Sequence, residues 1–347
     1  MKSFTAQNIN LPLNTIWLMN SISEYKGQQE LYMHQSPEVL NSLLEMALIE
    51  SAESSNKIEG VTVDKNRLKP LILGHSKPRD RSEEEVAGYR KALDFIHKQH
   101  KNINITPEFI KHLHSLCRGE IWDAGKWKEK DNEIIKRHPD GKVEVIFKPV
   151  KAKDTPEAIE QLCLTYRNSS DLNYPPLYAI ACLVLDFLCI HPFRDGNGRV
   201  SRLLTLTALY QHGYYVGKYI SIERIIERTK ETYYESLNKS SQGWDERKHN
   251  TFYWTNYFLG TIIAAYREFN ERAYTAKPKR GMKREMISSA VRKQFGEFGI
   301  ADLQKELPSI SRIMIKKVLM EMKNKKEIVS LGKGRSSKWI NNKGGIK

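Results

Sequence analysis

A continuous apolar segment that ends at a glycine-rich polar loop is the feature that most limits the folds open to this chain. The segment, Leu177–Ile190, contains 14 residues and includes Asp186. A membrane-spanning helix needs about 20 apolar residues, so this segment is too short to cross a bilayer. We therefore expect it to form a helix in the core of a globular protein, with the loop at its end.

Most of the chain has the spacing of apolar residues that is typical of amphipathic helices. Ser36-Pro37 predicts the start of a helix, and Gly60 follows its expected end near Ile58. Ser82–Glu85 resembles a capping box at the start of another helix. The expected helices of the main body cover about residues 37–58, 82–100, 106–116, 155–168, 176–190, 199–212, 222–239 and 251–276.

One segment departs from the helical pattern. Two β-prone runs, 133–135 and 143–147, flank the turn signal Pro139-Asp140-Gly141, which predicts a β-hairpin. Two strands alone are marginally stable, so such a hairpin needs a reason. It is either a surface excursion or an edge that accepts the backbone of another chain.

The positive charge is concentrated in the last part of the chain. Residues 277–347 contain 19 basic and 6 acidic residues, whereas residues 1–276 contain 37 basic and 35 acidic residues. The two segments therefore carry net charges of +13 and +2 out of a total of +15. This asymmetry favours a polyanionic partner for the tail.

The tail has the order of elements expected of a winged-helix domain. A basic linker with proline and glycine, 275–281, precedes three expected helices at 285–295, 300–307 and 309–323. Two strand-like runs, 328–331 and 337–340, follow around a basic glycine-containing turn. The tail would bind either DNA or a protein, and the candidate contact residues are Ser309, Ser311, Arg312, Lys316 and Lys317 on the last helix and Lys333, Arg335 and Lys338 on the wing.

The N-terminus lacks a basic region followed by an apolar run, so we expect no signal peptide. Four cysteines lie in mostly apolar helical contexts without the CxxC spacing of a metal site, which predicts reduced core residues. They are Cys117, Cys163, Cys182 and Cys189. Together these features predict a cytoplasmic protein without a membrane segment.

The loop after the apolar segment carries the chemistry. Gly196 and Gly198 leave room for a phosphate near the backbone, and the following helix begins with unpaired amides and a positive dipole end. Asp195 is an oxygen ligand of the kind that Mg²⁺ takes beside substrate phosphates. Arg199 and Arg202 are three residues apart, so both reach the same region.

His191, on the other side of this loop, is placed to act as a general base. Phe193 is expected to anchor the loop in the core. A histidine before a proline, or an Asp-Gly pair, is usually structural when it stands alone. The combination of these residue types within 12 positions, from His191 to Arg202, favours a functional site.

This loop resembles the signature of the Fic family, His-x-Phe-x-Asp/Glu-Gly-Asn-Gly/Lys-Arg. His191–Arg199 matches it at every defined position, and the second arginine, Arg202, is present. The resemblance implies a mainly α Fic helical fold with a β-hairpin flap, over about residues 81–276. We expect residues 1–80 to form an N-terminal helical region and residues 277–347 to form the small winged-helix domain.

The resemblance also implies an activity, protein adenylyltransfer from ATP with Mg²⁺. His191 would take the proton from a Ser, Thr or Tyr hydroxyl of a protein target, and Asp195 would hold the metal on the phosphates. Asn197 and the amides of Gly196 and Gly198 would bind phosphate oxygens, and Arg199 would stabilise the leaving pyrophosphate. Death-on-curing relatives that transfer phosphate carry lysine at the position of Gly198, so glycine there favours transfer of AMP.

Three further sites are implied by the same resemblance. The hairpin resembles the flap that aligns a target backbone, with Val145, Ile146 and Phe147 as contact residues. Tyr233-Tyr234 resembles a tyrosine pair near the nucleoside, although helix-core tyrosines would give the same pattern.

Ser55 and Glu59 share a helix face and resemble the family's inhibitory motif, in which Glu59 would pair with Arg202. In isolation the two residues are ordinary for a helix end. In the context of the loop, their pairing would remove Arg202 from the γ-phosphate and block productive placement of the triphosphate.

Two alternatives to protein adenylyltransfer remain open. The chain could be a DNA-binding regulator whose Fic body senses nucleotide, or the same loop could transfer or remove another phosphate-linked group. Retention of the histidine base favours an enzyme, because a sensor does not need it. A homodimer is compatible with the sequence.

Overall fold

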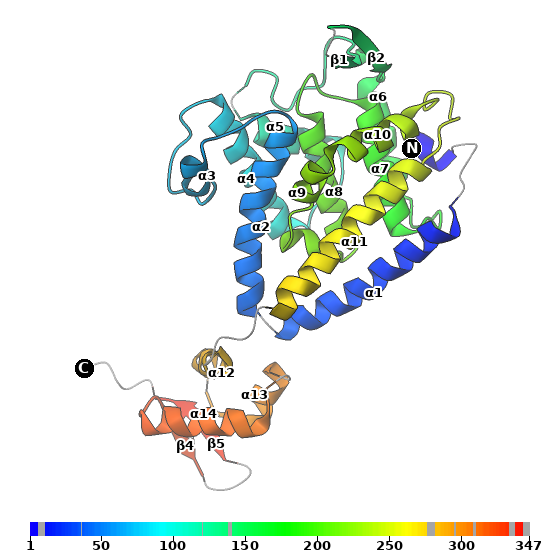
Figure 1. Ribbon diagram of the computed structural model, residues 1–347. Helices are drawn as coiled ribbons and strands as arrows, with labels where there is room; N and C mark the ends of the chain where they lie inside the picture. Colours follow the sequence, from blue (N-terminus) through cyan, green and yellow to red (C-terminus); the bar gives the residue numbers. More distant parts are fainter. Residues whose placement is uncertain are drawn as a thin grey trace. The chain divides into compact units, whose positions relative to one another are not determined.

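The computed structural model describes residues 1–5, 11–35, 37–119, 121–137, 141–275, 282–294, 296–307, 310–332 and 337–342. The chain forms two compact units, Met1–Glu30 with Glu38–Glu271, and Leu31–Pro37 with Arg272–Lys347. Within these described ranges there are fourteen α-helices, one two-stranded sheet and one three-stranded sheet (Figure 1). The expected mainly α fold is confirmed.

The first unit is built from helices that surround a buried central pair. The apolar segment forms α7, Pro176–Ile190, and it packs against α8, Asn197–Gln211. Nearly every residue of both helices is buried. The other helices are α1 (Leu13–Gln35), α2 (Pro37–Ile58), α3 (Lys65–Ile72), α4 (Arg81–Gln99), α5 (Pro107–Arg118), α6 (Thr155–Arg167), α9 (Ile222–Arg228), α10 (Lys230–Ser241) and α11 (Phe252–Thr275).

Several details of these helices differ from the sequence expectation. The cap of α4 is Asp80, whose side chain accepts from the amide of Glu83, and not the expected Ser82. The expected helix 222–239 is two helices, because the chain bends at Thr229 between α9 and α10. Helices α1 and α3 were not expected. Helix α1 packs along α11, where Tyr25 stacks on Tyr266.

A buried carboxylate joins three distant parts of the first unit. Asp186, which is 1% exposed, lies on α7 and accepts hydrogen bonds from the Oγ and the amide of Ser3 and from the Nε1 of Trp244. Ser3 belongs to a short 3₁₀ helix, Lys2–Thr5, and Trp244 follows α10. This polar residue inside the apolar segment therefore fixes the N-terminus and the loop after α10.

The expected hairpin is present as β1, Ile134–Arg137, and β2, Val143–Phe147, which pair antiparallel. The turn residues Pro139 and Asp140 lie outside the described residues. In Figure 1 the hairpin lies at one end of the helical unit, beside the end of α6.

The second unit has its own core. Helices α12 (Met282–Lys293), α13 (Ile300–Glu306) and α14 (Arg312–Asn324) pack with strands β3 (Phe298–Gly299), β4 (Ile328–Leu331) and β5 (Lys338–Asn341). The sheet order is β3-β5-β4, and both pairings are antiparallel. The short strand β3 was not expected. Residues 276–281 of the expected linker, together with Ser309, Lys333 and Arg335, lie outside the described residues.

In the described part of the chain, none of the helices combines the length and the apolar composition that crossing a bilayer would require. All four cysteines are buried and free.

The contacts of Asp186 lead to a stability prediction. Asp186→Ala leaves the buried donors of Ser3 and Trp244 without an acceptor, so we expect the free energy of unfolding to fall by about 2–4 kcal/mol. Urea unfolding followed by tryptophan fluorescence measures this. The control Asp171→Ala removes a carboxylate from an exposed position and should change stability by about 0.5 kcal/mol or less. Equal effects of the two substitutions would contradict the role of Asp186.

Candidate active site

Two left-handed backbone positions shape the loop between α7 and α8. His191 ends α7 with φ 51°, and Gly196 precedes α8 with φ 85°. Phe193 between them is fully buried, as its expected anchoring role requires. Because α8 begins at Asn197, its first amides have no acceptor in a preceding helical turn and face the loop.

A histidine from α5 supports the loop from below. The His114 ring stacks on Phe193 with centroids 3.7 Å apart and an interplanar angle of 5°. Its Nε2 donates to the carbonyl oxygen of Asp195 at 3.0 Å, and its Nδ1 accepts from the amide of Gly125 at 2.9 Å. A Cβ at Gly196 would lie 3.3 Å from this ring. Burial lowers the pKa of His114 to about 4, so the neutral ring is a structural part of the loop.

Asn197 holds the loop closed in this structure. Its Oδ1 accepts from the amide of Phe193 at 2.9 Å, and its Nδ2 donates to the carbonyl of the same residue at 2.8 Å. Both polar atoms of the side chain are therefore engaged by the loop itself. The phosphate-binding role of this side chain stays a prediction.

The imidazole of His191 has a defined tautomer. Its Nδ1 lies 3.3 Å from the carbonyl oxygen of Leu188, which can only accept, so Nδ1 carries the proton. Nε2 is then the atom with the free lone pair. Burial, with a smaller contribution from the charge of Lys128, lowers the pKa of His191 to about 4. The ring is therefore neutral at pH 7 and able to accept a proton.

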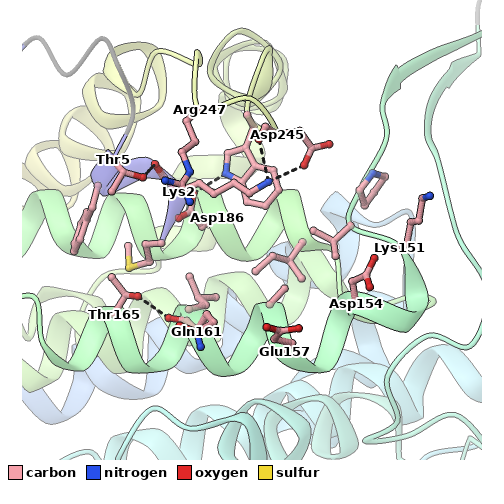
Figure 2. Close-up of a pocket in the computed structure, with 18 of the residues that line it drawn as sticks. Lys2, Thr5, Lys151, Asp154, Glu157, Gln161, Thr165, Asp186, Asp245 and Arg247 are labelled. Atoms are coloured by element: carbon pink, nitrogen blue, oxygen red, sulfur yellow. Dashed lines mark hydrogen bonds and ion pairs between the residues drawn. The ribbon is translucent and has the colours of Figure 1, made fainter.

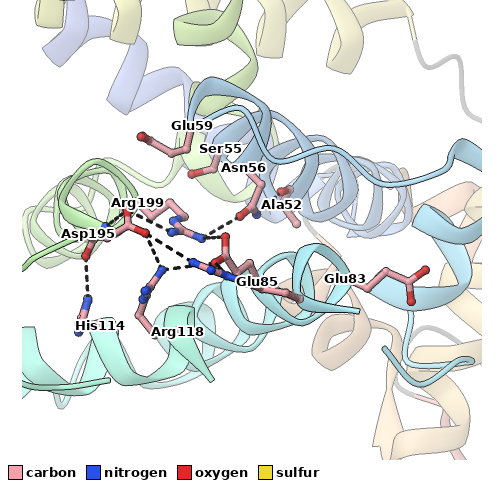
Figure 3. Close-up of polar contacts among 12 residues, drawn as sticks. Ala52, Ser55, Asn56, Glu59, Glu83, Glu85, His114, Arg118, Asp195 and Arg199 are labelled. Carbon is pink, nitrogen blue, oxygen red and sulfur yellow. Dashed lines mark hydrogen bonds and ion pairs between the residues drawn. The ribbon is translucent and has the colours of Figure 1, made fainter. Parts of the chain in front are cut away.

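A buried ion network lies beneath the loop (Figure 3). Arg199 and Arg118 are 1% and 4% exposed, and both pair with Glu85, at 2.7 and 3.3 Å. Arg118 also contacts Asp195 at 2.7 Å and Asp123 at 3.3 Å. Burial alone would raise the pKa of Asp195, but the charges of Arg118 and Arg199 outweigh it and the pKa lies below its usual value. Asp195 is therefore an anion that is half exposed at the edge of this ion network.

The predicted pair between Glu59 and Arg202 exists as a contact. The Nη2 of Arg202 lies 2.8 Å from the Oε1 of Glu59 and donates to the carbonyl of Ser55, while its Nε donates to the Oγ of Ser55. A Cβ at Gly198 would lie 2.3 Å from the same Oε1 of Glu59 and 3.2 Å from the Nη1 of Arg202. The Glu59 carboxylate thus lies directly against the glycine where a phosphate would approach.

The two tyrosines of the expected pair have different environments. Tyr233 is 3% exposed and packs edge-on against Trp254 and Tyr257, whereas Tyr234 is 44% exposed. Tyr233 and Arg202 line a cavity of about 20 Å³. Tyr233 is therefore a core residue beside the site, and Tyr234 is the one available to a ligand.

The predicted flap residues line a groove. Val145, Ile146 and Phe147 border a cavity of about 280 Å³ whose other wall is residues 241–246. Val145 is 43% exposed, and the ring of Phe147 meets Trp244 edge-on. The flap therefore has a groove along it where an extended segment can lie.

A larger cavity of about 1090 Å³ lies between α6 and the N-terminal 3₁₀ helix (Figure 2). Glu157, Gln161 and Thr165 of α6 form one wall, and Lys2 and Arg247 lie opposite. None of the sequence-predicted site residues lines it.

The residues fit a magnesium ion only when substrate phosphates supply most of its ligands. Asp195 is one half-exposed carboxylate, and Mg²⁺ is commonly held by one or two carboxylates together with phosphates. The described residues contain no group of three His, Cys, Asp or Glu side chains that could hold a metal by themselves.

The sequence analysis missed three members of this site: Glu85, His114 and Arg118. They lie on α4 and α5, at least 77 positions before their partners in the loop. Glu85 had been noted only as part of a capping signal. No local pattern marks a buried charge whose partner is distant in sequence.

Comparison with known proteins finds similarity to one family. Residues 104–209 match the model of the Fic/DOC family. Protein adenylyltransferase fic-1 of Caenorhabditis elegans is 25% identical over 168 residues, a match that covers 47% of this chain and 30% of that protein. The Caenorhabditis briggsae protein of the same name is 26% identical over 168 residues and is also covered to 30%. The chain thus spans less than a third of the length of these relatives.

Solved structures support the fold. A Fic family protein from Desulfovibrio desulfuricans G20 superposes with a TM-score of 0.64 at 19% identity, covering 97% of this chain and 98% of that one. A Fic domain containing signaling protein from Bacteroides thetaiotaomicron gives a TM-score of 0.61 at 21% identity, with 74% of this chain and 98% of that one covered. At this identity the likeness concerns the fold alone.

The environment of His191 leads to an NMR prediction. With a pKa of about 4, the imidazole should remain neutral and protonated on Nδ1 at pH 5.5, where an ordinary histidine with a pKa of about 6.5 would be mostly charged. Long-range ¹H–¹⁵N spectra of histidine-labelled protein report both tautomer and charge, and His191→Ala assigns the signal. A titration midpoint near 6.5 would contradict the buried environment.

Proposed function

We propose that this chain, which carries a Fic/DOC family domain, transfers AMP from ATP to a hydroxyl side chain of a protein, including its own. The observation that carries the proposal is the juxtaposition in one loop of a neutral imidazole with a free Nε2 and a cradle of helix-start amides and arginines. Nucleotidyl transfer needs two parts, a general base and a site that binds the phosphate groups, and this loop supplies both.

His191 would act as the general base that accepts the proton. As the target hydroxyl oxygen attacks the α-phosphorus, a new P–O bond forms and the bond to the β-phosphate oxygen breaks. Nε2 accepts the hydroxyl proton, and pyrophosphate leaves. The Nδ1–H bond to Leu188 holds the tautomer and thereby directs the lone pair outward.

The start of α8 would bind the phosphate groups of ATP. The amide at Gly198, the helix dipole and Arg199 stabilise the charge that develops on the leaving pyrophosphate. The amide of Gly196 donates to the Oδ1 of Asp195 in this structure, at 2.6 Å. Asp195 would hold Mg²⁺ on the α- and β-phosphates, where the ion would neutralise charge. Transfer of AMP rather than phosphate is favoured by glycine at position 198, in keeping with the resemblance noted above.

Glu59 is proposed to inhibit this reaction. Its carboxylate binds Arg202 and lies against Gly198. It therefore fills the space and neutralises the positive charge that a γ-phosphate would use. The Nη1 of Arg202 is buried without a hydrogen-bond partner and lies beside Gly198. A phosphate that displaced Glu59 would give this nitrogen an acceptor, which supports competition for one site.

Labelling experiments test the activity and its inhibition together. With α-labelled ATP and Mg²⁺, Glu59→Gly should raise self-labelling roughly 10- to 100-fold, the value of one charged hydrogen bond. His191→Ala in that background should lower it by about 10²–10⁴-fold, as expected for loss of a general base.

The controls separate inhibition from other effects. Glu53→Gly removes a carboxylate from α2, ahead of the turn that holds Glu59, and Glu53 makes no ion pair with Arg202 in the described residues, so it should not activate. Label from γ-labelled ATP would indicate phosphate transfer instead. Equal labelling of Glu59→Gly and the unsubstituted protein would remove the inhibitory role, and no label from either nucleotide would remove the transferase.

For the second unit we propose a winged-helix domain that binds duplex DNA. The exposed face of α14 carries Arg312, Lys316, Lys317 and Lys323 without an acidic residue among them. Within the described ranges none of the four lies within ion-pair distance of a carboxylate, and the acidic residue of this helix, Glu321, pairs with Arg284. Ile313, 83% exposed, lies on the same face and suits contact with a thymine methyl.

The four buried cysteines carry free thiols, which supports a reducing compartment, and we propose that the protein is located in the cytoplasm.

The DNA proposal predicts a salt-dependent affinity. Fluorescence anisotropy with a labelled duplex should show binding that weakens as salt rises, and Lys316→Glu with Lys317→Glu should reduce the slope against log salt by about 2. The control pair Lys91→Glu with Lys101→Glu makes the same charge change in the first unit. Binding that is equally weakened by both pairs, or absent in the unsubstituted chain, would contradict the proposal.

A further inference from the structure

Lys128 is a buried amine that the chemistry described so far does not use. It lies between α5 and the flap and is 5% exposed. Its Nζ donates to the carbonyl oxygen of Ile190 at 3.2 Å and to the Oδ1 of Asn132 at 2.9 Å. Its backbone amide donates to the carbonyl oxygen of Pro192 at 2.9 Å.

Two of these contacts enclose the proposed base. Ile190 and Pro192 are the chain neighbours of His191, so Lys128 binds the carbonyl before it and the carbonyl after it. The left-handed conformation of His191 is unfavourable for a residue with a Cβ, by about 1–2 kcal/mol. Such a conformation persists only where the surroundings hold it. Lys128 supplies that support from outside α7.

The third contact reaches the flap. Asn132 is two residues before β1, and its neighbour Asp131 accepts from the amide of Ala152, which lies five residues after the end of β2. Both ends of the hairpin are therefore tied together at its base. The Lys128 ammonium connects this base to the turn that carries His191.

The charge of Lys128 also acts on the imidazole. The groups that influence His191 are burial, which is the largest, the hydrogen bond to Leu188, and the charges of Lys128, Glu59 and Asp195. Lys128 lowers the pKa of His191, whereas the two carboxylates raise it. Burial lowers the pKa of Lys128 itself to about 8, opposed by Asp131, so most of its charge is present at pH 7.

We propose that Lys128 is a positioning residue that fixes His191 and the flap in one arrangement, so that the imidazole faces the hydroxyl of a segment docked on the flap. This role rests on the proposed AMP transfer. The contacts of Lys128 with Ile190, Pro192 and Asn132 do not depend on AMP transfer, because they lie within the chain itself.

The experiment compares Lys128→Met with Lys128→Arg in the full chain, using two readouts that need no catalysis. NMR titration should show a higher pKa for His191 in Lys128→Met, because a nearby positive charge is lost. Hydrogen exchange should be faster at the base of the flap, residues 132–135 and 146–152. Lys128→Arg, which keeps the charge and the donors, should restore both values. Lys126→Met, at an exposed position in the same segment, should change neither.

A third readout concerns the reaction. In the Glu59→Gly background, Lys128→Met should lower kcat of self-labelling on the order of 10- to 100-fold with little change in the KM for ATP, as expected from misplacement of a base. Asn132→Ala breaks only the contact to the flap, so it should speed exchange there and leave the pKa of His191 unchanged. This variant keeps the test decisive if Lys128→Met does not fold.

Unchanged His191 titration and flap exchange in Lys128→Met would overturn the positioning role, whatever the activity. If both change but no variant is labelled from ATP, the arrangement stands and the proposed transfer fails.

Discussion

The pairing of two buried guanidinium groups with one buried carboxylate supports everything else in the candidate site. Arg118 and Arg199 are both almost fully removed from water, and a buried charge without a partner is strongly destabilising. Glu85 binds both, and Asp195 and Asp123 complete the set. Because α4, α5 and α8 each contribute one of the three central residues, the network fixes these helices relative to one another. The loop above them takes its shape from that arrangement.

The two guanidinium groups of this network face three carboxylates, Glu85, Asp123 and Asp195. The positive potential of the site therefore comes from the helix-start amides of α8 and from Arg202, which lies outside the network. The site therefore attracts anions. In this structure the Glu59 carboxylate pairs with Arg202 and so neutralises part of the positive charge. The same carboxylate lies against Gly198, where a side chain would collide with it. A carboxylate from the turn after α2 and a phosphate would compete for the same groups, which gives the proposed inhibition a direct physical basis.

The proposed base and the proposed docking surface are separated in sequence but share a support. His191 ends α7, whereas the hairpin lies between α5 and α6. The Lys128 side chain contacts Ile190 at the end of α7 and Asn132 before the hairpin, and these contacts are the basis of the positioning role proposed for it. The second unit has a separate core and a separate basic helix face. Residues 277–347 carry +13 of the net charge of +15.

The sequence by itself determined the parts that are encoded locally. The loop from His191 to Arg202, the apolar helix before it, the hairpin and the contact of Glu59 with Arg202 were all expected, because each follows from residues adjacent in the chain or from a resemblance carried by a short motif. The mainly α fold was expected because helical periodicity is also local. The roles of Asn197 and Tyr233 were less accessible, since whether a side chain faces a ligand or the protein depends on its neighbours in space.

Only the tertiary structure decided how distant charges combine. Glu85 pairs with Arg199 across 114 positions, and Lys128 with Ile190 across 62, and no spacing rule connects such residues. The break between α9 and α10 and the two-residue strand β3 belong to the same class, because neither has a local signal and β3 exists by pairing with β5. For the two side-chain pairs the physical reason is the same. Burial removes water as a partner, and the protein must then supply the missing charge or hydrogen bond from whichever segment the fold brings near.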